Sequence, residues 1–449
     1  MSNSIKITKG FDIRLLGEAD KELRDNSTQN FALKPPDFIG VLPKLLVTEG
    51  DEVKAGTQVF FDKYRENIRF TSPVSGKVTE IVRGAKRVIL EVRIDSDGNQ
   101  TSVDFGKADP LSLTREDVIE KMLESGVWPL IRQRPYSVIA NPADKPKSVF
   151  ISGFDSAPLS PDYSFLLKGE ESVFQTGINA LSRLTDGKIH LNINEKAEIP
   201  AAYTQCSGVQ KNHFSGPHPA GNVGIQIAKI NPINKGDIVW YLRPQEVIII
   251  GRLFQRGVYD NSKLTALCGS ELVKTAYVKT RAGASIQEVV KANVKAGELR
   301  YISGNVLTGT NIGPKGYLGF YDNQVTVIPE GRYHEFVGWA LPGLDKFTFS
   351  KTFLSSLFPK KVFRPDTNFH GGERAFVMTG EYEKVLPLDI YPMHLLKAIL
   401  IDDIDQMERL GIYEVDEEDF ALCEVICSSK IEIQSIIRGG LDLMRREMS

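Results

Sequence analysis

Short apolar runs separated by glycine-centred turns fill the first part of the chain. Ile5, Ile7, Phe11 and Ile13 alternate with other residues and predict a small strand, after which a turn-rich connection follows. From Gly40 onward strands and turns follow one another regularly, which is typical of a small β-sandwich or barrel. The strands predicted there are Val41–Val47, Val59–Phe61, Lys77–Val82 and Val88–Ile94.

The apolar period changes after Thr114, where helices begin to alternate with strands. Thr114 and Asp117 have the spacing of a helix start, and Gly126 is placed to end that helix. A second amphipathic helix is predicted over Glu171–Leu184. The strands predicted in this region are Ser148–Ile151, Ile189–Ile193 and Val247–Ile250. This order indicates a Rossmann-like α/β domain with a mixed or parallel sheet.

Strands return around one helix between residues 257 and 335. Ser285 and Glu288 predict a capping box at the start of a helix over Ile286–Val294. Strands predicted on both sides of this helix, Lys274–Lys279, Leu299–Ile302 and Gln324–Ile328, indicate a β-grasp-like order. From Pro387 the pattern is mainly helical, and the predicted helices are His394–Ile401, Ile404–Leu410, Glu417–Cys427 and Ile431–Glu447.

Composition narrows the class of protein without changing this outline. The 449 residues suggest several domains, and 41% hydrophobic with 25% charged residues is ordinary globular usage. With 55 basic and 57 acidic residues there is no basic field for nucleic acid. No apolar run approaches the ~20 residues of a membrane helix, and the first residues lack the pattern of a signal peptide. Together with only four cysteines, these features predict a soluble cytoplasmic chain.

The turn pattern of the β domain resembles that of biotinyl and lipoyl domains, the barrel-sandwich hybrids. Glu49-Gly50-Asp51 and Ser72–Val78 carry this resemblance, and Lys63 stands near the place of the lysine that bears the swinging arm in carriers. Tyr64–Thr71 separate Lys63 from Ser72-Pro73, which predicts an enlarged hairpin tip. Because an enlarged tip does not present the lysine as a carrier does, we favour a structural relative over a modified carrier.

Cys423 and Cys427 are separated by three residues on a predicted helix. That is the spacing of the last two cysteines in a bacterial ferredoxin run, C-x2-C-x2-C-x3-C. The first two positions of such a run fall on Glu417 and Phe420, and no pair of thiolates stands there. We interpret this region as a cluster site that has been lost while its helical frame remains; a zinc site is the less favoured alternative.

Two glycine-containing loops are candidates for nucleotide binding. Gly216–Gly224 has glycines at spacings of five and three, which is not G-x-G-x-x-G, and no Lys-Ser/Thr follows. Gly153–Pro158 follows a predicted strand but also lacks a phosphate-cradling pattern. We interpret both loops as structural turns.

One loop combines aromatic rings with guanidinium groups. Trp128, Arg132, Arg134 and Tyr136 lie ahead of the strand Ser148–Ile151. Such a mixture can stack on a flat quinone ring and donate hydrogen bonds to its carbonyls. A solvated interdomain loop has the same residue types, and on residue type alone we favour that interpretation. The six histidines do not cluster at a ligand spacing, and no catalytic set can be recognised.

Taken together, these motifs resemble the A subunit of the Na(+)-translocating NADH:quinone reductases over nearly the whole chain. The resemblance rests on Ile5–Asp12, Ser72–Val78, Arg83–Val88, Arg132–Tyr136, His218–Gly224 and Leu410–Cys423. It implies a peripheral subunit on the cytoplasmic face of the bacterial inner membrane, within a complex that couples electron transfer from NADH to quinone with sodium export. It also implies that this chain contributes to quinone binding and holds no cofactor or metal of its own. NADH, flavins and an iron–sulfur cluster are then expected in partner subunits, among them integral membrane subunits.

Trp128, Arg132, Arg134 and Tyr136 become, within this resemblance, part of an expected quinone-head pocket. Replacing Arg132 and Arg134 by alanine should then weaken quinone binding and leave the fold intact. Two alternatives stay open. The same domain order resembles the cluster-bearing subunit of Rnf-type complexes and the flavoprotein subunit of complex I, so the chain could bind flavin or NADH. A carrier or adaptor built on the hairpin domain is the third hypothesis.

The predicted fold class is a multidomain α+β and α/β chain. Its predicted parts are an N-terminal segment (1–35), a biotinyl/lipoyl-like barrel-sandwich hybrid (36–107), a Rossmann-like α/β domain (108–256), a β-grasp domain of the SLBB type (257–335), a connecting segment (336–386), and a helical domain resembling a ferredoxin-like domain without its cluster (387–449).

Overall fold

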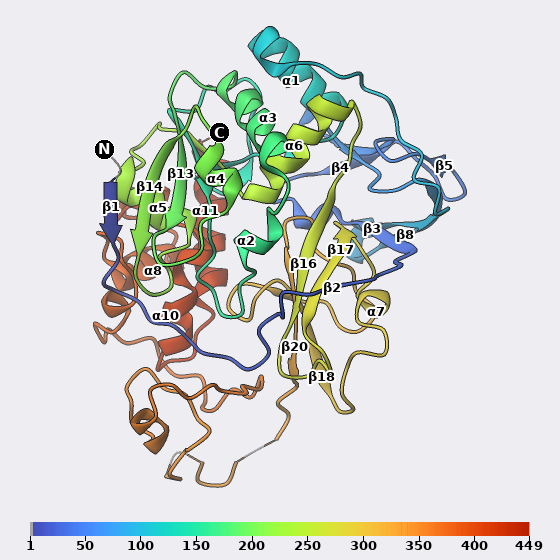
Figure 1. The fold of residues 1–449 in the computed structure, drawn as a ribbon. Coiled ribbons are helices and arrows are strands. Elements are labelled where there is room, and N and C mark those ends of the chain that lie inside the picture. The colour runs from blue at the N-terminus through green and yellow to red at the C-terminus, as the bar shows by residue number, and fades with distance from the viewer. Residues whose placement is uncertain (1–2, 334, 339, 449) are drawn as a thin grey trace.

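A computed structural model describes residues 3–333, 335–338 and 340–448. Two open sheets, a barrel-sandwich hybrid and a C-terminal helical region pack against one another (Figure 1). This is the mixed α/β architecture with a barrel-sandwich hybrid that the sequence predicts. The residue limits of the six predicted parts stay a prediction. Within the described ranges, no helix is both long and apolar enough to cross a membrane.

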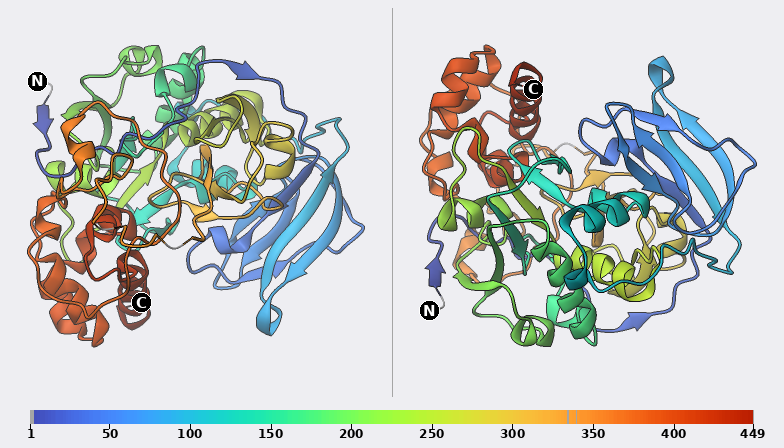
Figure 2. Two further views of the ribbon diagram at one scale, coloured as in Figure 1. Left: turned by 90° about the horizontal axis from the view of Figure 1, so that it is seen from below. Right: turned by 90° about the horizontal axis from the view of Figure 1, so that it is seen from above.

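The barrel-sandwich hybrid consists of two facing sheets, which lie on one side of the molecule in Figure 2. Their inward side chains, among them Phe60, Ile68, Phe70 and Val92, are fully buried because apolar residues alternate with polar ones along each strand. One sheet has the order β3-β9-β8-β5 and the other β4-β6-β7. The strands are β3 (Asn30–Leu33), β4 (Pro43–Leu45), β5 (Glu52–Val53), β6 (Gln58–Asp62), β7 (Arg65–Thr71), β8 (Gly76–Arg83) and β9 (Ile89–Ser96).

The hairpin around Lys63 differs from its prediction. Lys63 and Tyr64 alone connect β6 to β7, and both are exposed, so the expected enlarged tip is wrong. Asp62 pairs with Arg65 across this turn, with 3.0 Å between Oδ2 and Nε. The stretch Tyr64–Thr71, which was expected to be a loop, is almost entirely the strand β7. Its apolar side chains point inward while its backbone pairs with β6. The loop-length argument against a carrier therefore fails.

The second sheet is Rossmann-like and has the order β1-β14-β13-β12-β15-β10-β11. Its first five strands are parallel, β10 runs antiparallel to β15, and β11 runs antiparallel to β10. The chain builds outward from β12 through β13 to β14 and then returns to the other side of β12 with β15. The carboxyl ends of β12 and β15 therefore form a topological switch point, where open α/β sheets leave a crevice. The strands are β1 (Asn3–Lys6), β10 (Arg132–Arg134), β11 (Val138–Ile139), β12 (Ser148–Ser152), β13 (Lys188–Asn194), β14 (Gln210–Ser215) and β15 (Val239–Leu242).

Both faces of this sheet are buried, but by different parts of the chain. Val149 and Ile151 of β12 face the core formed with the helices α3 and α6, whereas Phe150 faces a core formed with α5 and the C-terminal helices. Such double burial explains the nearly continuous apolar runs of these strands. The helices of this domain are α1 (Arg115–Glu124), α2 (Tyr163–Leu166), α3 (Glu171–Ser182), α4 (Ala201–Gln205), α5 (Val223–Ile230) and α6 (Pro244–Arg256).

The predicted strand Val247–Ile250 is wrong, because these residues lie in the middle of α6. Pro244 occupies the first helical turn, Glu246 accepts a 2.6 Å hydrogen bond from the Arg243 N–H, and left-handed Gly257 ends the helix. The helix is buried almost all round, so its run of β-branched residues carries no helical period. Gly251 lets it approach α3 closely, since a Cβ there would lie 2.0 Å from the Val173 carbonyl oxygen.

The third sheet has the order β19-β18-β20-β16-β17-β2 and confirms strands on both sides of one helix. The predicted capping box is wrong: the Ser285 side chain makes no capping bond, and α7 (Ile286–Val289) is one turn long. Glu288 instead accepts hydrogen bonds from the backbone N–H groups of Gln29 and Asn30, at 2.9 and 3.0 Å. The strands are β2 (Leu23–Arg24), β16 (Ser262–Cys268), β17 (Ala276–Arg281), β18 (Leu299–Ser303), β19 (Thr310–Asn311) and β20 (Gln324–Pro329).

The N-terminal segment joins the domains. β1 forms one edge of the Rossmann-like sheet, and β2 forms an edge of the third sheet. The short strand predicted near Ile5 therefore exists only as part of a sheet built by residues some two hundred positions away.

The C-terminal region contains the predicted helices as α8 (Pro392–Leu400), α9 (Ile404–Arg409), α10 (Ala421–Ile426) and α11 (Ile433–Met448). The 3-10 turn η8 (Glu417–Phe420) replaces the start of the predicted helix Glu417–Cys427. Cys423 and Cys427 are buried, and the Tyr382 hydroxyl lies 2.9 Å from the Cys427 sulfur. They are part of a packed core.

Candidate functional site

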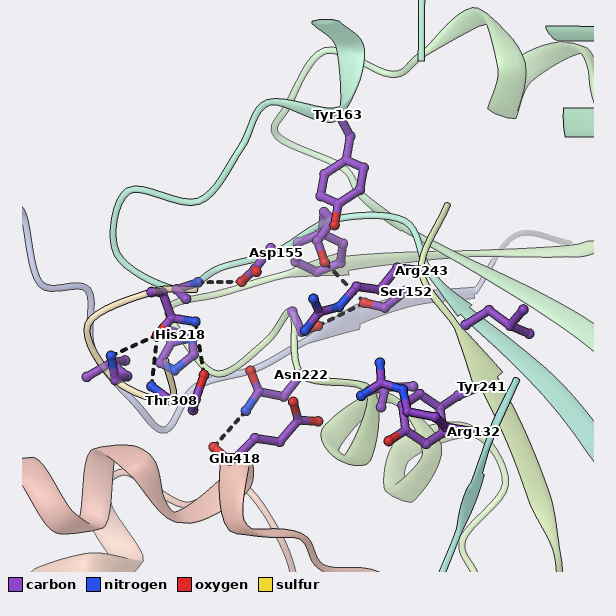
Figure 3. A pocket seen from close by; sticks show the side chains of 17 residues that line it. Arg132, Ser152, Asp155, Tyr163, His218, Asn222, Tyr241, Arg243, Thr308 and Glu418 are labelled. Carbon is purple, nitrogen blue, oxygen red and sulfur yellow. Dashed lines mark hydrogen bonds between the residues drawn. The ribbon is translucent and has the colours of Figure 1, made fainter. Parts of the chain in front are cut away.

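A cavity opens at the carboxyl ends of β12 and β15, the switch point of the Rossmann-like sheet (Figure 3). Its empty volume, including its mouth, is about 580 Å³. Its walls come from several parts of the chain: Arg132 of β10, the ends of β12 and β15 and the loops after β12 and β14, Tyr163, the loop 305–308 after β18, and Glu418 of the C-terminal region. Because ligands in open α/β sheets bind in this crevice, it is the candidate site.

Arg132 of β10 points into this cavity from between two tyrosine rings. Its guanidinium carbon lies 4.6 Å from the ring centre of Tyr241 and 4.4 Å from that of Tyr321. Tyr241 is buried and Tyr321 is partly buried, and their rings hold the cation by its flat faces. The Arg132 side chain makes no hydrogen bond or ion pair within the described chain, and its Nε is buried without a partner. The edge of the guanidinium therefore remains available to an acceptor in the cavity.

Three further side chains provide polar groups around the cavity. Arg243, immediately after β15, donates one hydrogen bond of 2.8 Å to the Tyr321 carbonyl. Tyr163 lies opposite it in Figure 3, and burial raises the pKa of the Tyr163 hydroxyl, which stays protonated. His218 shares a 3.0 Å hydrogen bond between Nδ1 and Ser156 Oγ, while its Nε2 is buried without a partner in the described chain. Burial lowers the pKa of His218 to about 4, so its ring is neutral near pH 7.

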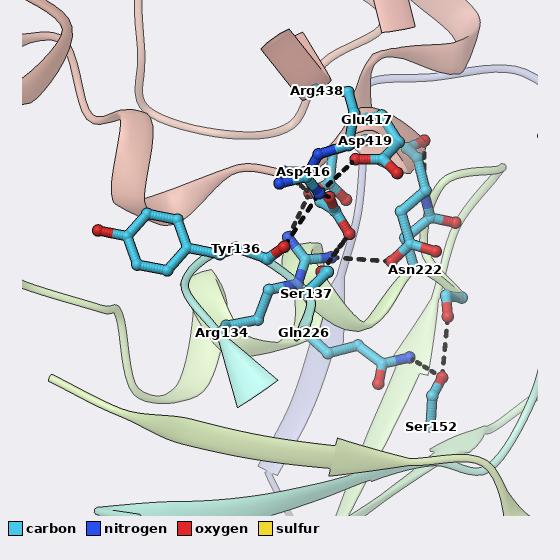
Figure 4. Close-up of polar contacts among 12 residues, drawn as sticks. Arg134, Tyr136, Ser137, Ser152, Asn222, Gln226, Asp416, Glu417, Asp419 and Arg438 are labelled. Carbon is cyan, nitrogen blue, oxygen red and sulfur yellow. Dashed lines mark hydrogen bonds and ion pairs between the residues drawn. The ribbon is translucent and has the colours of Figure 1, made fainter. Parts of the chain in front are cut away.

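An acidic turn of the C-terminal region borders the cavity and carries a buried ion-pair network (Figure 4). Arg134 Nη2 lies 3.3 Å from Asp416 Oδ2 and 2.9 Å from Glu418 Oε1, and its Nη1 lies 3.3 Å from Asp419 Oδ2. Ser137 donates a short hydrogen bond to Asp416. The network joins the β10–β11 loop to the acidic turn, so it fixes the helical region against the Rossmann-like domain.

The carboxyl groups of this network have strongly displaced pKa values. Burial raises the pKa of Glu417 to about 9, and the neighbouring Asp416 carboxylate adds to this shift. Burial also raises the pKa of Asp419 to about 7. Burial alone would raise the pKa of Asp416 too, but Arg134 holds it well below its usual range. The two neighbouring carboxyl groups therefore differ in protonation at pH 7: Asp416 is charged and Glu417 is neutral.

The acidic turn also covers the beginning of α5. A Cβ on Gly224 would lie 2.4 Å from Asp419 Oδ2, so this carboxylate rests against the first turn of the helix. Asn222, the residue before α5, donates a 3.0 Å hydrogen bond to the Glu418 carbonyl. The N-terminus of a helix beside a switch point favours anions. At α5 this position is taken by the Asp419 side chain of the same protein.

The structure does not bring the four sequence-predicted residues together. Of the four, only Arg132 lines the cavity. Trp128 is fully buried, donates a 2.8 Å hydrogen bond from Nε1 to the Ala140 carbonyl, and packs edge-on against Trp240. Arg134 is taken up by the ion-pair network. Tyr136 is partly buried, and its ring centre lies 6.3 Å from that of Tyr413 in the helical region.

Sequence reasoning did not single out several residues of the cavity, among them Tyr163, His218, Asn222, Tyr241 and Arg243. Two signals could have found them. The loops Gly153–Pro158 and Gly216–Gly224, interpreted as plain turns, follow β12 and β14 and both contribute to the cavity. Arg243 follows β15. The sequence pattern predicts no strand there and places one instead at Val247–Ile250, which belongs to α6.

The fold and the cavity together define the class of protein: a multidomain α/β chain with a ligand-sized crevice in its Rossmann-like sheet. A loop of the β-grasp domain borders this crevice, and a carboxylate of the helical C-terminal region lies against the start of α5. Three family models match the chain in sequence. "NqrA N-terminal barrel-sandwich hybrid domain" matches residues 5–97, "NqrA second alpha/beta domain" residues 113–259, and "NQRA C-terminal domain" residues 264–313.

Curated relatives extend this match to the whole chain. The A subunit of the Na(+)-translocating NADH-quinone reductase of Yersinia pseudotuberculosis is 40% identical over 447 residues, covering 99% of this chain and all of the relative. That of Rhodopirellula baltica is 39% identical and covers 98% of each chain. The protein belongs to the family formed by the A subunits of the Na(+)-translocating NADH-quinone reductases. It is thus a subunit of an oxidoreductase complex, as the sequence motifs predict. Among solved structures, a chain of an NAD+-reducing [NiFe]-hydrogenase matches with a TM-score of 0.40 and 12% identity, over 75% of this chain and 62% of that chain.

Proposed function

We propose that this chain forms part of the quinone site of its reductase, as a peripheral subunit on the cytoplasmic face of the bacterial inner membrane. The sodium-translocating complex passes electrons from NADH to quinone, and the flavins, the iron–sulfur cluster and the membrane spans belong to its other subunits. In this proposal the chain binds and orients the quinone head and carries no redox centre. The observation that supports it best is the Arg132 guanidinium, which faces the cavity without a hydrogen-bond partner in the described chain.

The side chains around Arg132 suit a quinone carbonyl. Tyr241 and Tyr321 sandwich the guanidinium, so its N–H groups are oriented before a ligand arrives. A charged donor strengthens a hydrogen bond to a carbonyl oxygen, and the bond tightens further as negative charge develops there on reduction. The protonated Tyr163 hydroxyl and neutral His218 offer additional polar contacts within the same cavity.

Replacing Arg132 by alanine is expected to raise the KM for quinone about tenfold or more, because one hydrogen bond to a charged donor contributes about 1.5–3 kcal/mol. The measurement is NADH-driven reduction of a short-chain quinone by the purified complex. Arg132→Lys should recover part of the affinity, since lysine keeps the charge but not the planar fork.

Arg256→Ala is the matched control, because Arg256 lies at the end of α6 with its side chain about half exposed. Electron transfer from NADH to ferricyanide, an acceptor that needs no quinone site, should be unchanged in every variant. An Arg132→Ala complex with an unaltered KM for quinone would contradict the proposed role. A yellow chain after removal of all other subunits would instead favour the flavin-binding alternative.

A further inference from the structure

Residues 341–378 form a long surface segment with little regular structure. All of them are described, and within them the four-residue 3-10 turn η5 (Leu354–Leu357) is the only helix or strand. In Figure 1 the segment, in orange, projects below the sheets and helices. We refer to it below as the 341–378 segment.

Specific contacts hold this segment in place against three parts of the molecule. Phe363 exchanges backbone hydrogen bonds with the N-terminal residues Arg14 and Leu16, at 2.9 and 2.8 Å. Arg364 Nε donates to Glu271 Oε1 at 2.7 Å, and Ser429 donates to the Ala375 carbonyl at 3.0 Å. The segment is therefore presented in one orientation by the folded domains around it.

The exposed side chains of the segment are unusually apolar. Nine of its large hydrophobic side chains are at least 48% exposed: Leu341, Leu344, Leu354, Leu357, Phe358, Val362, Phe369, Val377 and Met378. At the end of η5 the neighbours Leu357 and Phe358 are 70% and 57% exposed. Scattered exposed leucines are normal, but so many large apolar side chains exposed along one segment, two of them adjacent at Leu357 and Phe358, indicate a surface that another molecule covers.

The charge of the segment differs from that of the rest of the chain. It has six basic and three acidic residues, a net charge of +3, while the whole chain carries −2, so the remaining residues carry −5. Lys351 and Lys360 are exposed on either side of Leu357 and Phe358. A partner that fits this surface combines apolar side chains with acidic groups.

Insertion into a lipid bilayer fits the segment less well than a protein partner does. Backbone N–H and C=O groups without a helix or sheet partner cannot enter hydrocarbon without a large cost, and almost all of this segment is irregular. Peripheral membrane binding usually relies on an amphipathic helix, which a four-residue turn does not provide. A protein surface can satisfy such backbone groups while it covers the apolar side chains.

We propose that the 341–378 segment docks this chain onto an acidic, apolar surface of another subunit of the same reductase, with Leu357 and Phe358 at the centre of the contact. The inference rests on the proposed role as a peripheral subunit. Because the segment reaches the N-terminal segment, the β-grasp-like domain and the helical region at once, docking there would hold all three relative to the membrane part of the complex.

The test uses the whole complex with an affinity tag on this chain. The double variant Leu357→Asp, Phe358→Asp is expected to keep the melting temperature of the isolated wild-type chain, since both side chains are mostly exposed. The fraction that co-purifies with NADH:quinone reductase activity from solubilised membranes should fall at least tenfold. Leu111→Asp is the matched control, because Leu111 is 54% exposed in the turn before α1, and it should co-purify like the wild type. Full co-purification of the double variant would overturn the proposal.

A photoreactive phenylalanine analogue at position 357 identifies the occupant directly. In native membranes we expect a cross-link to another polypeptide of the complex, found by mass spectrometry, that disappears when Lys351 and Lys360 are replaced by glutamate. Cross-links to lipid alone, together with binding of the isolated chain to phosphatidylglycerol vesicles, would overturn the protein partner in favour of a membrane surface. A wild-type chain that never co-purifies with reductase activity would contradict the proposed function itself, which separates the two failures.

Discussion

Replacing Arg134 by alanine is expected to lower the free energy of unfolding by about 3–5 kcal/mol, the usual cost of leaving buried charges without their partner. Arg134 is fully buried and lies within 3.3 Å of carboxylate oxygens of Asp416, Glu418 and Asp419. Without the guanidinium these carboxyl groups repel one another in a buried site. Urea unfolding of the isolated chain measures the loss, and limited proteolysis should release the helical region first.

Arg93 provides the control for this variant. It pairs with Glu80 and Glu91 on the partly exposed face of β8 and β9, so Arg93→Ala should cost less than about 1 kcal/mol. Arg134→Ala with wild-type stability would contradict the structural role of the network. The sequence predicts the same result for both arginines, namely weaker quinone binding with an intact fold. From the structure we expect Arg132→Ala to raise the KM for quinone and Arg134→Ala to lower the free energy of unfolding.

Replacing Glu417 by glutamine is expected to stabilise the protein at pH 8 by at least about 1 kcal/mol and to flatten its stability between pH 6 and 9. Burial raises the pKa of Glu417 to about 9 from an ordinary value of 4.5. Between these values the folded chain keeps a proton that the unfolded chain has lost. Stability therefore falls as pH rises through this window, by at most about 1.4 kcal/mol for each pH unit.

Glutamine imitates the protonated form of Glu417. Its amide can donate to Asp416, as the carboxylic acid does, and its carbonyl can accept the hydrogen bond that Arg438 donates at 3.1 Å. Asp419, whose pKa burial raises to about 7, adds a second decline of stability that ends near pH 7. Thermal unfolding at pH 6, 7.5 and 9 distinguishes the two contributions. If the wild type and Glu417→Gln show the same dependence above pH 7, Glu417 is not protonated in the folded state.

Much of the fold could be predicted because local patterns and tertiary structure agree. Thr114 and Asp117 form the expected capping box at the start of α1, and the apolar faces of α3 and α11 lie on the cores. The predictions failed where tertiary contacts override local signals. Val247–Ile250 is helical because Pro244, Glu246 and Gly257 delimit α6, whose apolar side chains are buried. Glu288 leaves its expected cap because backbone N–H groups from the N-terminal segment compete for it.

The candidate site was harder to predict for the same reason. Arg132 and Arg134 are two positions apart on β10, yet one lines a cavity and the other sits in a buried ion-pair network. Residues two positions apart on a strand share a face, so the sequence could not separate them. What separates them is the acidic turn Asp416–Asp419, brought there by helices almost three hundred residues later.

Local patterns along the chain were sufficient to predict many of the helices and strands, because turns, caps and apolar periods act over a few neighbouring residues. The resemblance to the reductase family rested on short motifs distributed along the sequence. The cavity at the switch point, the carboxylate against α5, the insertion of β1 and β2 into separate sheets and the exposed 341–378 segment depend on contacts between distant parts of the chain. Burial and the pairing of charges are properties of the assembled molecule. Only the tertiary structure could therefore decide which arginine is available to a ligand and which one holds the protein together.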